Sequence, residues 1–513
     1  MAEPYRIVIG LEVHVQLLTR TKLFCGCSTQ FGLPPNSATC PVCIGMPGVL
    51  PVMNRRAFDL ALKAALALNC HIASFTKWDR KNYYYPDLPK NYQISQYDLP
   101  FSSDGWLEIP LTPDPSPARG EGRKTEPPSP LAGEGSGVRG KRIGIIRVHL
   151  EEDAGKMLHD EGGGGADSRV DLNRAGTPLL EIVSKPEMTA PEEARAYLEE
   201  IRLLLRELEV SDCEMQEGSL RCDANVNIHV PLADGTVVAT PIVEVKNLNS
   251  IAAVERATRY EAERQFEEFR ANNNYQMGKV AKATAGWDDA ARVTRVQRRK
   301  EEASDYRYFP EPDLVPVTVS AEQLEAVRAS LGELPAAQHA RLQTQYGLSD
   351  YDARVLTRQG RALVAYFEEV ARLGGDAKEA SNWVTNQVLQ TLNERKTTIK
   401  DFPLPPAALA ELIKCKKGGL NVQRSREVYA RMLETKASAA QTIKELGFEQ
   451  VDDEKLREIV RKAVAANPKA VADYKKGKTK AADAIKGAVM RETKGMARTE
   501  LVQQLLQQEL EKV

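Results

Sequence analysis

In the N-terminal half of the chain, apolar runs are repeatedly interrupted by polar residues that stand two positions apart. Side chains at positions i and i+2 of a strand point to the same face of a sheet. The spacing therefore predicts a sheet with one apolar face and one face that gathers carboxylates, an imidazole and amides. The residues concerned are Glu12 with His14, Asp171 with Asn173, Asp223 with Asn225 and Asn227, Glu244 with Lys246, and the cluster Glu151, Glu152 and Asp153 after another strand-like run.

A polar face of this kind has a chemical consequence. One such pair alone is equally compatible with a solvated strand face, but repetition of the pattern favours a shared site. Clustered carboxylates repel one another unless cations bind them, and oxygen-rich sites suit Mg²⁺, which typically bridges substrate phosphates. The sequence contains no GxxxxGK[ST] motif, so the nucleotide site it indicates is not a P-loop. Sheet carboxylates with metal are the alternative, with Arg221, Lys246 or the basic stretch 292–300 on phosphate.

The hydrophobic pattern changes near residue 320. Before that point, strand-like runs mix with a few amphipathic helical stretches, which is typical of an α+β fold with a largely antiparallel sheet. After it, leucine and alanine recur at three- and four-residue spacing, which predicts helices alone. Because 513 residues are too many for one ordinary core, we expect two or three domains, the first of which ends near residue 320.

Residues 112–140 interrupt this organisation. The segment holds six prolines and six glycines and has almost no apolar residue to bury. We interpret it as a disordered insertion between two strands, with a partner-binding arm as the functional alternative.

Four cysteines form two tight knuckles, Cys25-Gly-Cys27 and Cys40-Pro-Val-Cys43. Four thiolates at this spacing can converge tetrahedrally on Zn²⁺, and a site with only protein ligands is closed and structural. The remaining cysteines are scattered, and we interpret them as small apolar residues. The chain shows neither a secretory leader nor an apolar run approaching about 18 residues, so we expect a reduced, cytoplasmic protein without membrane contact.

Two further groups could contact nucleic acid. A basic, glycine-broken stretch near the C-terminus includes Lys475, Lys476, Lys478 and Lys480, and such a helical tip suits a phosphate backbone. The alternative is a solvated charged face. Aromatic and basic residues also cluster at 78–92 and 305–313, where they could stack bases or form packed interface structure.

At these residues the sequence resembles the B-subunit family of the aspartyl/glutamyl-tRNA(Asn/Gln) amidotransferases, which are tRNA-dependent and hydrolyse glutamine. The resemblance covers nearly the whole chain except 112–140. It is carried by IGLEVHVQ at 9–16, KNYYYPDLPKNYQISQ at 81–96, HLEEDAGK at 149–156, DLNRAGTPLLEI at 171–182, EVKNLN at 244–249 and DYRYFPEPDL at 305–314.

The resemblance implies a catalytic cradle domain over 1–320 that is similar to the glutamine synthetase catalytic fold, then a helical domain over 321–400 and a helical tRNA-binding tail over 401–513. It implies a ligase that forms carbon–nitrogen bonds with glutamine as amido donor. In that family this subunit uses ATP and Mg²⁺ to phosphorylate the side-chain carboxylate of Glu on tRNA(Gln) or Asp on tRNA(Asn). A partner amidase subunit supplies ammonia, and a small third subunit completes the heterotrimer.

On this basis we assign candidate roles. Metal-site and ATP-site candidates are Glu12, His14, Glu151 and Glu152, followed by Glu214, Glu217, Asp223 and Glu244. Residues expected to orient the nucleotide or the acyl group are Asp171, Asn173, Arg221, Asn225, Lys246 and Asn247.

No plausible glutaminase nucleophile stands in the sequence. The nearest candidate is Cys70-His71, which follows an apolar helical stretch and is interpreted as packing. Ammonia must then come from a partner. Two rival hypotheses stay open: a non-catalytic tRNA-binding scaffold, and an autonomous small-molecule ligase of the glutamine synthetase kind. ATP hydrolysis that requires charged tRNA would separate all three.

Overall fold

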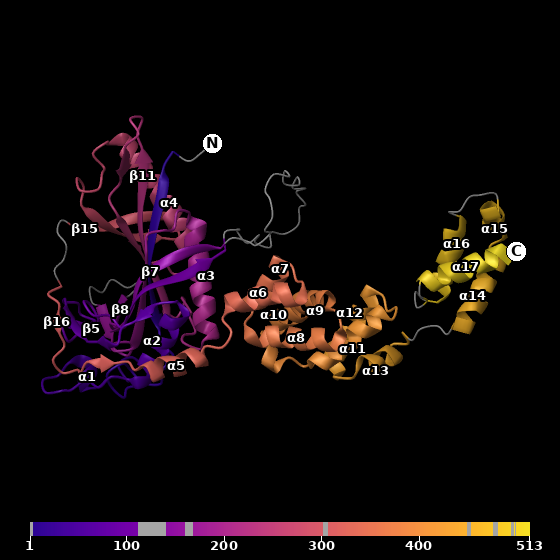
Figure 1. The fold of residues 1–513 in the computed structure, drawn as a ribbon, viewed down its shortest axis with the longest axis horizontal. Coiled ribbons are helices and arrows are strands. Elements are labelled where there is room, and N and C mark those ends of the chain that lie inside the picture. The colour runs from indigo at the N-terminus through magenta and orange to yellow at the C-terminus, as the bar shows by residue number, and fades with distance from the viewer. Residues whose placement is uncertain are drawn as a thin grey trace. The chain divides into compact units, whose positions relative to one another are not determined.

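The structure is a computed structural model, and it describes residues 4–110, 140–159, 168–300, 306–448, 453–475, 481–493, 497 and 499–512. Two compact units divide the chain, Met1–Leu334 and Pro335–Val513. The first carries the strands and the second is helical wherever it is described, which confirms the predicted α+β fold (Figure 1). Of the predicted insertion, all but Gly140 lies outside the described residues.

One large sheet forms the framework of the first unit. Among the described residues its strand order is β15-β14-β13-β11-β1-β10-β7-β6-β2, with β12 paired to β11. All neighbours are antiparallel except the parallel pair β13 and β14, which confirms the largely antiparallel sheet. The strands are β1 (Arg6–Gln16), β2 (His71–Ile72), β6 (Ser102–Ile109), β7 (Lys141–Glu152), β10 (Pro178–Ser184), β11 (Leu220–Pro231), β12 (Val237–Ala239), β13 (Val243–Lys246), β14 (Lys282–Asp288) and β15 (Val293–Lys300).

Helices cover the apolar face of this sheet. They are α2 (Arg55–Ala67), α3 (Pro191–Glu207) and α4 (Ile251–Ala271), and they pack against strands β7, β6 and β11 respectively. Alternate strand residues such as Leu11, Val13 and Val226 are fully buried beneath them. The helices begin where the sequence permits: Asn54 and Ser250 accept hydrogen bonds from the first turns of α2 and α4, and Pro191 opens α3. With one face covered, the polar side chains at alternate positions are left on the other.

Shorter strands form a second layer near that polar face. The three-stranded sheet β16-β4-β5 brings a segment near residue 309 beside residues 79–95. Arg80 fixes this approach, because its guanidinium donates to Glu311 and to Asp313. The short elements are α1 (Pro41–Ile44), β3 (Phe75–Thr76), β4 (Asp79–Asn82), β5 (Tyr92–Ser95), β8 (Lys156–His159), β9 (Ser168–Asp171), β16 (Phe309–Pro310), β17 (Val317–Thr318) and α5 (Ala321–Ser330).

In the second unit two hydrophobic cores are built from helices alone. One core spans residues 342–439 and continues through residue 400, where the resemblance implies a domain boundary. The other spans residues 456–510. The helices are α6 (Pro335–Tyr346), α7 (Asp350–Arg358), α8 (Arg361–Gly374), α9 (Ala377–Trp383), η1 (Val384–Val388), α10 (Leu389–Arg395), η2 (Ile399–Asp401), α11 (Pro406–Lys417), α12 (Val422–Thr435), α13 (Ala439–Glu445), α14 (Asp453–Ala466), α15 (Pro468–Lys475), α16 (Ala481–Glu492) and α17 (Thr499–Lys512).

Two predictions from the sequence concern this unit, namely the basic C-terminal stretch and the absence of a membrane-spanning helix. Helix α15 ends at Lys475, whose side chain lies outside the described residues, as do Lys476, Lys478 and Lys480 entirely. Within the described part of the chain, no helix combines the length and the apolar character needed to cross a membrane.

Candidate functional site: an acidic cavity on the sheet

Strand register aligns reactive side chains in rows across the polar face. His14 on β1 stands opposite Glu181 on β10, and Glu181 stands opposite His149 on β7. In the next row, Glu12 stands opposite Asp223. Cross-strand neighbours lie within about 5.5 Å at Cβ, so side chains from distant parts of the sequence meet here.

These rows form the floor of a cavity of about 670 Å³. This is within the usual range of about 300–1,000 Å³ for small-molecule sites. Seven of the predicted site residues line it: Glu12, His14, Glu151, Asp223, Asn225, Glu244 and Lys246.

An acid–histidine cluster occupies one end of the cavity. His14 Nε2 lies 3.8 Å from a Glu151 oxygen and 3.6 Å from a Glu181 oxygen. His149 Nε2 lies 3.2 Å from Glu181. One ligand atom each from His14, Glu151 and Glu181 falls within 4.8 Å of the other two, so this trio could hold a metal ion.

Neighbouring charges shift the pKa values of the groups in this cluster. Burial alone would lower the pKa of His14, but its hydrogen bond to Glu181 and the surrounding carboxylates raise that pKa to about 9. Burial opposes ionisation of Glu181, yet the charge of His149 and the hydrogen bond from His14 hold the pKa of that carboxyl well below its usual range. Glu12 behaves differently, since burial and the charge of Glu181 raise its pKa. The cluster thus gathers carboxylates around His14, and a bound cation would take the place of the His14 proton, because only the neutral imidazole can act as a metal ligand.

Lys246 provides a positive charge in the lining of the same cavity. Its ammonium pairs with Asp223, and it lies 2.8 Å from Glu244. The charges of both carboxylates outweigh burial and raise the pKa of Lys246. Glu12 accepts a 2.9 Å hydrogen bond from Asn225, so the floor is hydrogen-bonded from strand to strand.

Several cavity residues escaped the sequence analysis. Glu181 and His149 belong to the acid–histidine cluster, and Arg147 also lines the cavity. Lys81, from the predicted aromatic and basic group at 78–92, lines it as well. His149 precedes Glu151 by two positions, and the same spacing rule applied one step further would have found it. Glu181 is a lone carboxylate in an otherwise apolar strand. A charged group at such a position is costly to bury without a partner, so it could have indicated a site residue. The wall also includes stacked Tyr97 and Tyr308, whose ring centroids are 3.9 Å apart.

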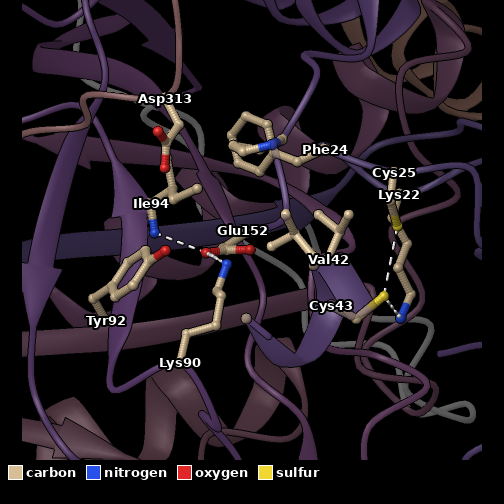
Figure 2. Close-up of a pocket in the computed structure, with 14 residues that line it drawn as sticks. Lys22, Phe24, Cys25, Val42, Cys43, Lys90, Tyr92, Ile94, Glu152 and Asp313 are labelled. Atoms are coloured by element: carbon tan, nitrogen blue, oxygen red, sulfur yellow. Dashed lines mark hydrogen bonds and ion pairs between the residues drawn. The ribbon is translucent and has the colours of Figure 1, made fainter. Parts of the chain in front are cut away.

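Glu152 points away from the cavity. Successive residues of a strand face opposite sides of a sheet, so Glu151 and Glu152 at the end of β7 diverge. The Glu152 carboxylate pairs with the ammonium of Lys90 and accepts a 2.8 Å hydrogen bond from the backbone N–H of Ile94 (Figure 2). The structure therefore separates it from the cluster of His14, and its predicted role as a magnesium ligand does not match this placement.

Other candidates also lie outside the cavity lining. Asp171 and Asn173 hold a loop: Asp171 accepts from the Asn36 N–H, and Asn173 accepts from the Ala38 N–H and donates to Pro34. Arg221 donates to Asp153, and Glu214 pairs with Arg202 and Arg206. Neither Glu217 nor Asn247 is among the residues that line the cavity.

The four predicted cysteines converge. Cys43 Sγ lies 3.5 Å from Cys25 Sγ, 3.7 Å from Cys40 Sγ and 3.8 Å from Cys27 Sγ. All four sulfur atoms fall within 4.8 Å of one another. A tetrahedron with Zn–S bonds of about 2.3 Å has edges of about 3.8 Å, so the geometry fits a zinc ion. Cys70, by contrast, is buried with its sulfur against Gly105, as a packing residue would be.

Comparison with known proteins adds an independent finding. Residues 7–325 match a family model described as the GatB/GatE catalytic domain, and residues 365–510 match one described as the GatB domain. The chain is 50% identical over 504 residues to the B subunit of the aspartyl/glutamyl-tRNA(Asn/Gln) amidotransferase of Rhodopirellula baltica, covering 98% of this chain and 96% of that one. Proteins of the same name from Carboxydothermus hydrogenoformans and Thermotoga maritima are 46% and 45% identical over 512 residues, covering 99% of both chains in each case. The likeness therefore spans both structural units.

Proposed function

Because this chain belongs to the B-subunit family of the aspartyl/glutamyl-tRNA(Asn/Gln) amidotransferases, we propose that its sheet cavity is where ATP activates an aminoacyl-tRNA. The resemblance predicted from sequence is thereby confirmed. The chain is a subunit of a ligase that forms carbon–nitrogen bonds with glutamine as amido donor. The proposed substrate is the side-chain carboxylate of Glu on tRNA(Gln), of Asp on tRNA(Asn), or of both.

The observation that carries this proposal is the meeting of acidic and basic groups in one cavity. An oxygen of the substrate carboxylate bonds to the γ-phosphorus of ATP, and the bond from that phosphorus to the bridging oxygen breaks as ADP leaves. Negative charge then spreads over the phosphoryl oxygens. Lys246, Lys81 and Arg147 line the space where these oxygens would lie, and preorganised cations there lower the barrier.

The acid–histidine cluster supports a magnesium site. Glu151, Glu181 and His14 would hold the ion, with Glu12 beside them, and the donor set is rich in carboxylate oxygen as Mg²⁺ requires. A bound Mg²⁺ would neutralise phosphate charge. The residues around it would position the carboxylate and exclude water.

Amidation completes the reaction. Ammonia attacks the acyl carbon and phosphate leaves, giving the amide on tRNA. The buried Cys70 is no glutaminase nucleophile, so we propose that ammonia comes from a partner amidase subunit, with a small third subunit completing a heterotrimer. We propose that the four-cysteine cluster holds structural Zn²⁺. The C-terminal lysines would contact tRNA; they include Lys475, Lys476, Lys478 and Lys480. The proposed compartment is the cytoplasm.

Glu151 and Glu152, which face opposite sides of β7, provide a test of the proposed phosphoryl-transfer site. We would measure release of γ-phosphate from labelled ATP by the purified complex with Glu-tRNA(Gln), comparing Glu151→Gln with Glu152→Gln. Loss of a metal-binding carboxylate costs several kcal/mol of transition-state stabilisation, so Glu151→Gln should slow release about 100-fold or more. Glu152→Gln, which alters the other side of the strand, should slow it less than about tenfold.

Two other outcomes would be decisive. Equal losses in both variants, with tRNA binding intact, would contradict the assignment of the phosphoryl site to this cavity. No release by the unsubstituted complex despite tRNA binding would favour the scaffold hypothesis, and release without tRNA would favour the small-molecule ligase.

A further inference from the structure

Lys22 is a fully buried lysine next to the cysteine cluster. Its side chain has no exposed area, although lysine is almost never buried completely without a partner. The ammonium Nζ lies 3.5 Å from Cys43 Sγ (Figure 2). It also lies 3.2 Å from the carbonyl oxygen of Leu172. Among the residues that the structure describes, its hydrogen-bond partners are this sulfur and this carbonyl oxygen, and neither belongs to a carboxylate.

A buried ammonium with this surrounding needs a counter-ion. Burying an unpaired charge costs several kcal/mol even after relaxation. A single carbonyl oxygen does not supply that compensation, and neither do neutral thiols. Four thiolates around a divalent metal carry a net charge of −2, and that charge would stand directly against the ammonium.

We propose that Lys22 is the outer-sphere cation of the cysteine metal site, donating to the Cys43 thiolate and neutralising part of the charge of the metal–tetrathiolate unit. This inference rests on the proposed zinc site. Lys22 would be a positioning residue that orients the Cys43 thiolate. Partners of this kind orient metal ligands and commonly change metal affinity by about 10- to 100-fold.

The same lysine joins the knuckles to a neighbouring segment. Lys22 donates to Leu172, and the Leu23 N–H donates to the carbonyl of Gly176 at 2.8 Å. A Cβ placed on Gly176 would come within 3.5 Å of the Lys22 stem and 3.9 Å of a Glu152 oxygen. Metal occupancy would therefore fix Lys22, and through it the segment 172–176 that borders Glu152.

The test uses the full-length chain and a matched lysine. Lys63 is partly buried on α2 and donates to the carbonyl of Leu208, so Lys63→Met serves as the control for Lys22→Met. We would determine zinc stoichiometry and then follow release of zinc to a chromogenic chelator. Lys22→Met should release zinc about tenfold faster or more, while Lys63→Met should match the unsubstituted chain.

Thermal unfolding with and without zinc separates charge compensation from packing. If Lys22 balances the thiolates, removing zinc should lower the melting temperature of the unsubstituted chain more than that of Lys22→Met. An equal effect of the substitution in the zinc-loaded and zinc-free chains would overturn the proposal. If Lys22→Met does not fold, Lys22→Gln keeps a donor without the charge, and zinc release as slow as in the unsubstituted chain would overturn it as well. Absence of zinc from the unsubstituted chain would overturn both this inference and the zinc site.

Discussion

Two aspartate–arginine pairs in the first unit have the same closest nitrogen–oxygen distance but differ in burial. Asp153 and Arg221 meet at 2.6 Å, and so do Asp289 and Arg256. The arginines are similarly exposed, at 34% and 40%, whereas the aspartate side chains are 3% and 60% exposed. Asp153 also lies 3.5 Å from Arg174, and Asp289 accepts a 2.9 Å hydrogen bond from Trp287. Asp153→Asn and Asp289→Asn therefore compare a buried carboxylate with an exposed one at the same distance from an arginine.

The expected effect of Asp153→Asn follows from this burial. Breaking a buried pair costs about 3–5 kcal/mol because the remaining charge loses its counter-ion, and partial exposure of Arg221 places the value at the lower end, about 3 kcal/mol. With an unfolding entropy of about 2.1 cal/mol/K per residue over roughly 330 residues, the melting temperature of the first unit should fall by about 4 °C. Asp289→Asn should leave it unchanged within error, since exposed pairs contribute little.

Differential scanning calorimetry of the full-length chain measures both variants, with the helical unit as an internal reference. The pH dependence gives a second check. Burial opposes ionisation of Asp153, but Arg221 and Arg174 lower its pKa in the folded chain. Its contribution is therefore fully present above the unfolded pKa of about 3.9 and is lost as the pH falls through the lower folded value. Equal shifts in the two variants, or a difference that persists below that range, would refute the reasoning.

Three other substitutions test separate parts of the structure. Glu181→Gln removes a carboxylate from the acid–histidine cluster and should raise the Mg²⁺ concentration needed for half-maximal ATP cleavage about 10-fold or more; an unchanged Mg²⁺ titration would remove Glu181 from the metal site. Lys246→Met leaves Asp223 and Glu244 without their shared cation and should slow tRNA-dependent ATP cleavage by about 100-fold, whereas normal turnover would exclude Lys246 from phosphate binding. Ser250→Ala removes the N-cap of α4 and should destabilise the first unit by about 1 kcal/mol in urea titration, with no change expected in zinc content.

Much of the cavity could be predicted because strand alternation is a local rule. Glu12, His14, Asp223 and Lys246 follow directly from the spacing of two. Glu181 could not be found this way, because its place beside His14 depends on the pairing of β1 with β10, which joins residues far apart in the sequence.

Strand β7 shows the limit of a prediction from clustering alone. The sequence places Glu151 and Glu152 together, but neighbouring strand residues cannot share a face. Asp171 differs from its prediction for another reason: it stands on β9, which pairs with β8 outside the large sheet. Spacing within a strand says nothing about which sheet the strand joins. The cysteine cluster needed no such knowledge, since four thiols within nineteen residues are brought together by two tight turns.

Because Glu151 and Glu152 face opposite sides of the sheet, the function of β7 depends on whether each residue stays at an odd or an even position along the strand. The long segment 112–140 enters the chain between β6 and β7, outside the paired residues, so it adds length without changing which side each β7 residue faces. A deletion of one residue within β7 would exchange the two glutamates, whereas a deletion of two would restore the original order of faces. In this chain, twenty-nine added residues between two strands should therefore be tolerated more easily than a single residue lost from the strand that follows.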